Sequence, residues 1–129
     1  MSHKIHSVED EVTLSEAYHT LLKQAKYDVT VAHDGKDALK KVESFDPDLI
    51  LLDLRMPILD GVGFLKEYDL KHKHPNVKVI VFSNYDMQEE IDEAYRLGAD
   101  RYILKAWASP REILNLVKDA LDPSQAERH

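Results

Sequence analysis

Short apolar runs alternate with longer amphipathic stretches along this chain. Five runs have the length and composition of β-strands, at residues 5–8, 27–32, 49–52, 77–82 and 101–104. Between the runs, apolar residues recur at helical spacing, as in the stripe that includes Leu14, Tyr18 and Leu22. The pattern predicts five units, each a strand followed by a helix.

Polar residues mark the predicted helix ends. Three pairs have the spacing of a capping box, namely Thr13 with Glu16, Asp86 with Glu89, and Ser109 with Glu112. Gly98 is suited to ending the fourth helix, and Asp122 with Pro123 to ending the last. The segment 61–70 has a weaker helical pattern, and Tyr18 and Tyr95 are both expected on buried stripes.

Repeated strand–helix units predict an α/β fold, a parallel sheet with helices on both faces. The run 49–52 is apolar at every position, so we expect it to be a central strand covered on both sides. The first strand contains His6 and Ser7, whose polar side chains should be hydrogen-bonded if they are buried.

Composition excludes several classes of protein. The 129 residues suit one domain, and the absence of cysteine excludes disulfides and thiolate chemistry. A formal charge of -7 argues against direct nucleic-acid binding, and no apolar run approaches the length of a membrane span. We therefore expect a soluble, cytoplasmic domain. His72 and His74, interleaved with lysines before Pro75, are expected in a solvated connector and not in a metal site.

Chemically active side chains follow four of the predicted strands. Glu9 and Asp10 follow the first strand, Asp53 the third, Ser83 the fourth and Lys105 the fifth. The carboxyl ends of parallel strands meet in one crevice, where three carboxylates are unfavourable unless a cation is bound. Their hard oxygen ligands suit Mg²⁺, whereas a set without cysteine fits zinc poorly.

With a cation present, one carboxylate could act as a nucleophile and form an aspartyl phosphate. Asp53 is the stronger candidate because it ends the most apolar strand, while Asp10 stays a metal ligand. Ser83 would hydrogen-bond one phosphoryl oxygen and Lys105 would neutralise another.

These residues lie in short motifs: Val8-Glu9-Asp10-Glu11, Leu51-Leu52-Asp53-Leu54-Arg55-Met56-Pro57 with Asp60-Gly61, Val81-Phe82-Ser83, Gly98-Ala99 and Tyr102-Ile103-Leu104-Lys105. In this order the motifs resemble the receiver domain of bacterial two-component response regulators of the chemotaxis-regulator type. The resemblance spans residues 4–121. It implies a flavodoxin-like (βα)5 three-layer sandwich with strand order 2-1-3-4-5, a receiver domain at 1–122 and a polar tail or linker at 123–129.

The resemblance also implies roles. Asp53 would accept a phosphoryl group from a histidine kinase or a histidine phosphotransfer protein. Mg²⁺ would be held by Glu9, Asp10, Asp53 and the backbone carbonyl of Arg55. Ser83 would be the switch hydroxyl, Tyr102 the aromatic whose rotamer follows it, and Lys105 the phosphate-binding cation.

Phosphorylation in this family repacks the face built from the fourth helix, fifth strand and fifth helix, here about residues 87–119. That face would bind an output domain or a target protein. The domain itself would be a monomer or a phosphorylation-dependent dimer. The domain would not be an enzyme acting on external substrates.

Two positions depart from the family pattern, Ala106 and Asn84. Ala106 stands where a proline in a cis bond usually follows the lysine, so the loop is either trans and rearranged or strained, because a cis bond before alanine costs about 3 to 4 kcal/mol. Asn84 is bulkier than the usual residue and could narrow access or bind phosphate. Arg55 and Tyr85 occupy positions that tune phosphate lifetime in the family.

Three alternatives share parts of this pattern. Mg²⁺-dependent phosphohydrolases of the haloacid dehalogenase type carry a second aspartate where this chain has Arg55, which is a poor acid or base. Flavodoxins bind FMN phosphate in the first loop, which is acidic here and repels phosphate. The third alternative, a receiver-like scaffold that is never phosphorylated, ranks below the signalling function, because the full acceptor set is present.

Overall fold

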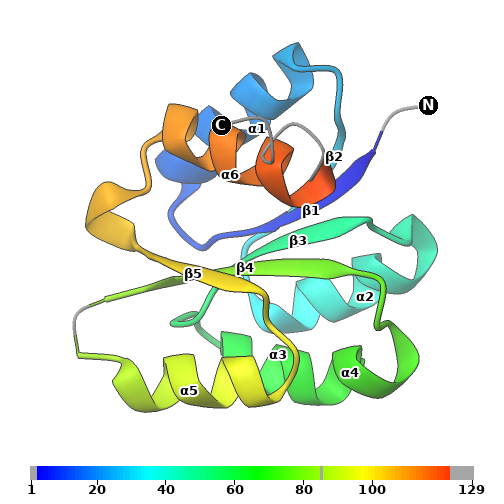
Figure 1. Ribbon diagram of the computed structural model, residues 1–129, viewed down its shortest axis with the longest axis vertical. Helices are drawn as coiled ribbons and strands as arrows, with labels where there is room; N and C mark the ends of the chain where they lie inside the picture. The colour runs from blue at the N-terminus through cyan, green and yellow to red at the C-terminus, as the bar shows by residue number, and fades with distance from the viewer. Residues whose placement is uncertain (1–2, 85, 123–129) are drawn as a thin grey trace.

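The computed structural model describes residues 3–84 and 86–122 (Figure 1). The strands are β1 (Lys4–Val8), β2 (Asp28–Ala32), β3 (Leu49–Asp53), β4 (Lys78–Ser83) and β5 (Arg101–Leu104). The helices are α1 (Val12–Gln24), α2 (Gly35–Phe45), α3 (Gly61–Tyr68), α4 (Leu70–Lys73), α5 (Gln88–Arg96), a 3-10 turn η1 (Lys105–Trp107) and α6 (Pro110–Leu121). The predicted tail at 123–129 and Tyr85 lie outside the described residues.

All five strands are parallel and lie in the order β2-β1-β3-β4-β5, which confirms the predicted fold and strand order. Helices α1 and α6 cover one face of the sheet, and α2, α3, α4 and α5 cover the other (Figure 1). The molecule is therefore a three-layer sandwich, as the repeated strand–helix units predict.

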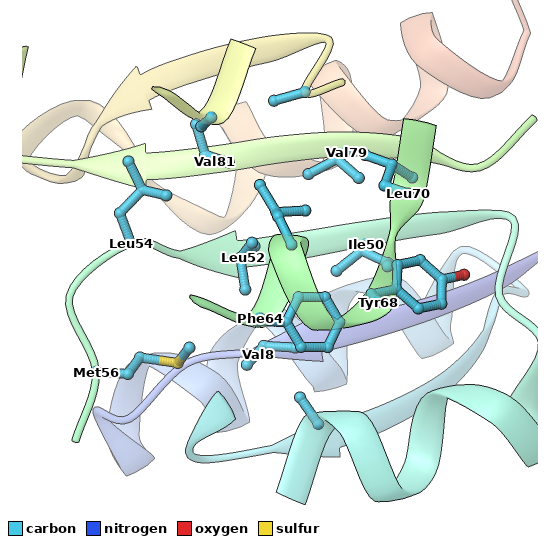
Figure 2. Packing of buried hydrophobic residues seen from close by; sticks show 14 of the residues in the cluster. Val8, Ile50, Leu52, Leu54, Met56, Phe64, Tyr68, Leu70, Val79 and Val81 are labelled. Atoms are coloured by element: carbon cyan, nitrogen blue, oxygen red, sulfur yellow. The ribbon is translucent and has the colours of Figure 1, made fainter. Parts of the chain in front are cut away.

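Strand β3 divides the core into two clusters because successive side chains point to opposite faces. Leu49 and Leu51 pack with the residues under α1 and α6. Ile50 and Leu52 pack in the second cluster, which Figure 2 shows with Phe64 of α3 beside them. All five residues of β3 are buried, so the prediction of a central strand covered on both sides is confirmed.

The helix starts follow the sequence only in part. Ser109 and Asp60 are N-caps whose side chains accept hydrogen bonds from backbone N–H groups, as the capping pattern predicts for Ser109. The N-caps expected at Thr13 and Asp86 are wrong, because Glu11 precedes α1 and Met87 precedes α5, and neither caps through its side chain. The backbone carbonyl of Glu11 accepts the N–H of Ser15, which starts α1 earlier.

The helix predicted over 61–70 is interrupted. Helix α3 ends at Tyr68, and Asp69 adopts the left-handed region with φ 56° before the four-residue α4 begins. The connector expected around His72 is therefore partly helical; His72 is exposed and His74 stacks on the Tyr68 ring at 4.0 Å. Across residues 3–84 and 86–122, no helix is long and apolar enough to cross a membrane.

Two core predictions need correction. Tyr18 is buried as expected, but the Tyr95 side chain is 42% exposed, because it lies at the edge of the α5 stripe that Ile91 and Ala94 bury. On β1, His6 is hydrogen-bonded to the carbonyl of Ala38 at 3.1 Å, which confirms that prediction. Ser7 is equally buried, yet its hydroxyl has no hydrogen-bond partner within the part of the chain that the structure describes.

Candidate functional site

Four carboxylates converge on one lysine at the carboxyl ends of the strands. Lys105 Nζ lies 2.8 Å from Asp53 Oδ2 and 3.1 Å from Glu9 Oε2. Glu11 Oε1 is 3.4 Å away and Asp10 Oδ1 is 4.0 Å away. The structure therefore brings together the acidic residues and the lysine that the sequence scatters from position 9 to position 105.

The sheet itself sets these positions. Asp53 is the last residue of β3 and is paired with Phe82 of β4, while Leu104, just before Lys105, is paired with Ser83. The backbone N–H of Glu9 donates to the carbonyl of Ala32, so pairing of β1 with β2 continues up to the pocket. Strand ends in register thus deliver each group to the same edge.

Backbone donors orient two of the carboxylates. Asp53 Oδ1 accepts the N–H of Arg55 at 3.1 Å, and Glu9 Oε2 accepts the N–H of Glu11 at 3.0 Å. Both carboxylates are buried, and each is held by a backbone group and by Lys105: on separate oxygens in Asp53, and on the same oxygen, Oε2, in Glu9. This arrangement fixes their rotamers before any ligand arrives.

The electrostatics of the pocket disfavour so many negative charges. Burial raises the pKa of Glu9 to about 8, against the opposing effects of the Glu11 N–H and Lys105. Burial also raises the pKa of Asp53, although its hydrogen bond to Lys105 works in the opposite direction. Burial disfavours the charge on Lys105, but the hydrogen bond to Asp53 and the charges of Asp53 and Glu9 outweigh it and raise its pKa. One lysine leaves the pocket short of positive charge.

The donor set fits a small hard cation. Carboxylate oxygens of Glu9, Asp10 and Asp53 lie within 4.8 Å of one another, and no other such group of potential metal ligands occurs in residues 3–84 and 86–122. Glu9 Oε1 is buried and finds no hydrogen-bond partner among those residues. An unpartnered buried carboxylate oxygen beside two further carboxylates is suited to Mg²⁺, which takes oxygen ligands and keeps several waters.

The two predicted switch residues lie apart. Ser83 ends β4 and is buried, and its hydroxyl makes no hydrogen bond within the described part of the chain. Tyr102 lies on β5 and is 46% exposed, with its ring edge-on to that of Tyr95 at 6.2 Å. The structure therefore places Ser83 at the carboxyl edge of the sheet and Tyr102 outside the pocket, against α5.

Three neighbours of the pocket are absent from the sequence-based predictions. Glu11 contacts Lys105, and His33 Nδ1 is 2.9 Å from the carbonyl oxygen of Glu9. Arg55, predicted to supply a backbone carbonyl, also forms an exposed ion pair of 3.7 Å with Asp86. The run of three acids at 9–11 could have indicated Glu11, but no local pattern points to His33 or Asp86.

The segment after Lys105 shows whether the peptide bond before Ala106 is cis or trans. No cis peptide bond occurs among residues 3–84 and 86–122, so the bond before Ala106 is trans. Lys105, Ala106 and Trp107 form a 3-10 turn closed by the N–H of Ala108 and the carbonyl of Lys105. The alternative of a trans bond therefore holds. The Asn84 side chain is exposed, and its backbone N–H donates to Met87 Sδ at 3.4 Å.

Comparison with known proteins identifies the family of this site. The profile of the response regulator receiver domain matches residues 5–118. The alkaline phosphatase synthesis transcriptional regulatory protein PhoP of Bacillus subtilis (strain 168) is 38% identical over 127 residues, which are 97% of this chain and 51% of that protein. The chain thus spans about half the length of that relative.

Solved structures of receiver domains are also similar to this chain. A CheY-like response regulator receiver domain protein from Methanospirillum hungatei JF-1 is 27% identical with a TM-score of 0.86, over 98% of this chain and 99% of that one. A response regulator signal receiver domain from Bermanella marisrubri is 31% identical with a TM-score of 0.81, over 95% and 100%. Receiver domains generally bind Mg²⁺ at an acidic pocket and work with histidine kinases and output domains. This chain belongs to the response regulator receiver domain family, the phosphoacceptor signalling domains of two-component systems.

Proposed function

We propose that this chain is a phosphorylation switch in which Asp53 accepts a phosphoryl group from a histidine kinase or a histidine phosphotransfer protein. The observation that supports it most directly is the 2.8 Å contact between Lys105 Nζ and Asp53 Oδ2 in a buried pocket. The contact holds a nucleophile next to the cation that would neutralise the incoming phosphoryl oxygens.

In the transfer, an Asp53 carboxylate oxygen attacks phosphorus and a new O–P bond forms as the N–P bond of the donor phosphohistidine breaks. The electron pair of that bond returns to the imidazole nitrogen of the donor. The transition state is loose, so positioning and charge neutralisation supply most of the catalysis. Lys105 would exchange its contact with Asp53 for one with a phosphoryl oxygen.

Glu9, Asp10, Asp53 and the backbone carbonyl of Arg55 are the proposed ligands of Mg²⁺. The cation would supply the positive charge that a single lysine cannot, both before transfer and on the developing phosphoryl charge. The raised pKa of Glu9 and the unpartnered Glu9 Oε1 support this assignment.

Ser83 and Tyr102 are the proposed switch pair. The Ser83 hydroxyl has its hydrogen-bonding capacity free within the described residues, so it can donate to a phosphoryl oxygen on Asp53. Movement of Ser83 would open space next to β5, into which the exposed Tyr102 ring could turn from its place against Tyr95. The surface formed by α5, β5 and α6, about residues 87–119, would then change shape for an output domain or a target.

Several wider assignments follow from the same proposal. Residues 1–122 would form the receiver domain, located in the cytoplasm, with a tail or linker beyond it. The domain would be a monomer or a phosphorylation-dependent dimer, would not bind nucleic acid directly, and would catalyse only its own phosphorylation and dephosphorylation. The residue at position 55 supports the last point, because Arg55 is a poor acid or base and stands where such a phosphohydrolase carries a second aspartate.

The test uses acetyl phosphate, a small donor, with Mg²⁺ and mass spectrometry of the intact protein. One acid-labile phosphoryl adduct should form and should be lost in Asp53→Asn. Asp60→Asn is the matched control, because Asp60 caps α3 nearby and asparagine caps equally well. An unchanged mass at high donor concentration, or an adduct that persists in Asp53→Asn, would overturn the proposal and favour a scaffold that is never phosphorylated.

A further inference from the structure

The turn that carries Lys105 has few attachments to the rest of the fold. Strand pairing ends at Leu104, and Ala106 and Trp107 are exposed, the latter by 68%. The N–H of Ala108 closes the turn on the carbonyl of Lys105, which is a bond within the turn itself. The turn therefore depends on whatever side chains reach it from other elements.

One side chain outside the acidic pocket reaches this turn. The hydroxyl of Tyr18, on α1, donates a hydrogen bond of 2.6 Å to the carbonyl oxygen of Ala108. Both residues are buried, and Ala108 is the one buried residue in the segment 105–108. Across residues 3–84 and 86–122, no other side chain outside the pocket hydrogen-bonds to residues 105–108.

The ring of Tyr18 makes a second connection. It packs on Phe82 with the ring centroids 5.6 Å apart. Phe82 is paired with Asp53 on β3 and with Ile103 on β5, and it precedes Ser83. The ring of Tyr18 thus contacts β4, the strand paired with Asp53, and its hydroxyl contacts the turn that carries Lys105.

The hydroxyl remains a donor under all ordinary conditions, because burial and the nearby charge of Glu9 raise the pKa of Tyr18 above its usual value. A buried carbonyl that loses its donor is costly, so the Tyr18 bond favours one position of Ala108 strongly over its alternatives. Lys105 is three residues away within the same closed turn.

We infer that Tyr18 is a positioning residue for phosphorylation: its bond to Ala108 holds the 3-10 turn so that Lys105 Nζ points at Asp53. The inference rests on the proposed function, in which Lys105 neutralises the phosphoryl group. Its physical basis is that a turn whose outer residues face solvent needs an external anchor to hold a lysine within 3 Å of a carboxylate.

Tyr18→Phe tests this, because it removes the hydroxyl and keeps the ring on Phe82. The maximal rate of Asp53 phosphorylation by acetyl phosphate should fall about tenfold, since misplacement of a charged group by a fraction of an ångström has effects of that order. The concentration of Mg²⁺ needed for half-maximal rate should stay within about twofold, because the carboxylate ligands keep their backbone donors.

A double-mutant cycle separates positioning from general loss of stability. In a Lys105→Ala background, Tyr18→Phe should lower the rate no further, because the group that it positions is gone. Val42→Ala is the matched control, a buried change in α2 on the other face of the sheet that should leave the rate unchanged. An equal loss of rate in both backgrounds, or no loss in Tyr18→Phe, would overturn the inference.

Trp107 gives a readout that does not depend on phosphorylation. It is the single tryptophan of the chain and lies in the anchored turn, so its fluorescence anisotropy reports the motion of that turn. The anisotropy should fall in Tyr18→Phe and stay unchanged in Val42→Ala. If the wild-type protein takes no phosphoryl group, the proposed function fails and the anisotropy alone decides: an unchanged value in Tyr18→Phe would show that the anchor does not exist.

Discussion

Strands β3 and β5 deliver the two oppositely charged groups of the site, yet they are built differently. All five residues of β3 are buried, and the strand is paired with β1 on one side and β4 on the other. Strand β5 has four residues, pairs with β4 alone, and leaves Arg101 and Tyr102 exposed. Asp53 and Lys105 nevertheless end 2.8 Å apart.

The difference shows how rigidity is divided within the site. The proposed acceptor, Asp53, ends a strand that is paired on both sides. Tyr102 lies on the edge strand β5 and Lys105 directly follows that strand, where movement breaks few contacts. The proposed switch would use this division, with the acceptor held in place while the β5 edge responds.

The largest expected difference between β3 and β5 is in the free energy of unfolding that is lost when one core residue of each strand is truncated. Leu51→Ala should lower the free energy of unfolding by about 2 to 5 kcal/mol, because a fully buried leucine leaves a cavity. Ile103→Ala, in β5, should lower it by about 1 to 2 kcal/mol, since Ile103 is only partly buried. Urea unfolding followed by circular dichroism measures both. Equal losses would show that β5 is as restrained as β3.

The pH dependence of Mg²⁺ binding tests the buried end of the site. Because the pKa of Glu9 is raised to about 8, a proton competes with the cation below that pH. The affinity for Mg²⁺ should therefore rise between pH 6 and pH 8, by up to about tenfold per unit, and level off above. Titration calorimetry in Glu9→Gln should show a flatter profile.

The raised pKa of Glu9 also determines whether the stability of the metal-free protein rises or falls with pH. The folded state binds Glu9's proton more tightly than the unfolded chain, so the stabilisation is fully present below pH 4.5 and is lost as the pH rises through about 8. Addition of Mg²⁺ should reverse this trend. The free energy of unfolding is measured without metal in the wild type and in Glu9→Gln. If it rises over this pH range by the same amount in both proteins, the raised pKa of Glu9 is contradicted.

Removal of the Lys105 side chain, which follows β5, tests the other side of the pocket. Lys105→Ala should tighten Mg²⁺ binding by about tenfold or more, because a positive charge within 4.0 Å of all four carboxylates disappears. Phosphorylation of Asp53 should nevertheless slow. Lys118→Ala, an exposed lysine on α6, is the control and should change neither quantity. Weaker Mg²⁺ binding in Lys105→Ala would mean that the lysine organises the carboxylates instead of repelling the metal.

The smallest effect is expected on the exposed face of β5. Tyr95→Leu and Tyr102→Leu remove the edge-on aromatic pair, whose coupling at a half-exposed site should be about 0.5 kcal/mol. A double-mutant cycle in urea measures that coupling. If phosphorylation moves Tyr102 away from Tyr95, the coupling should vanish in the phosphorylated protein and persist in the unmodified one.

Most of the fold could be predicted from periodicity alone, and the helix starts show where local patterns fail. Strand β3 reads as central because every residue in it is apolar up to the final aspartate, and Ser109 caps α6 because its own side chain reaches a nearby N–H. Thr13 carries a good capping pattern but lies inside α1, because the carbonyl of Glu11 already accepts the N–H of Ser15 and the helix begins at Val12.

Some residues of the site could likewise be predicted from the sequence, and others could not. Carboxylate, hydroxyl and amine groups that directly follow apolar runs point to Asp10, Asp53, Ser83 and Lys105 through their places in the chain alone. The exposed position of Tyr102 could not be predicted, because it depends on the edge-on contact of its ring with Tyr95, a residue of α5 that is itself exposed. The same holds for the contact of Tyr18 with Ala108, which joins residues 90 positions apart.

The amino-acid sequence by itself determined the alternation of strands and helices, the central place of β3 and the chemical groups at the strand ends, because each depends on the polarity of neighbouring residues. Tertiary structure alone decided that Glu9 has a buried, unpartnered oxygen within the described residues, that Lys105 contacts four carboxylates, and that Tyr18 reaches the turn after β5. Those properties depend on distances between residues far apart in the chain, and such distances exist only once the sheet has formed.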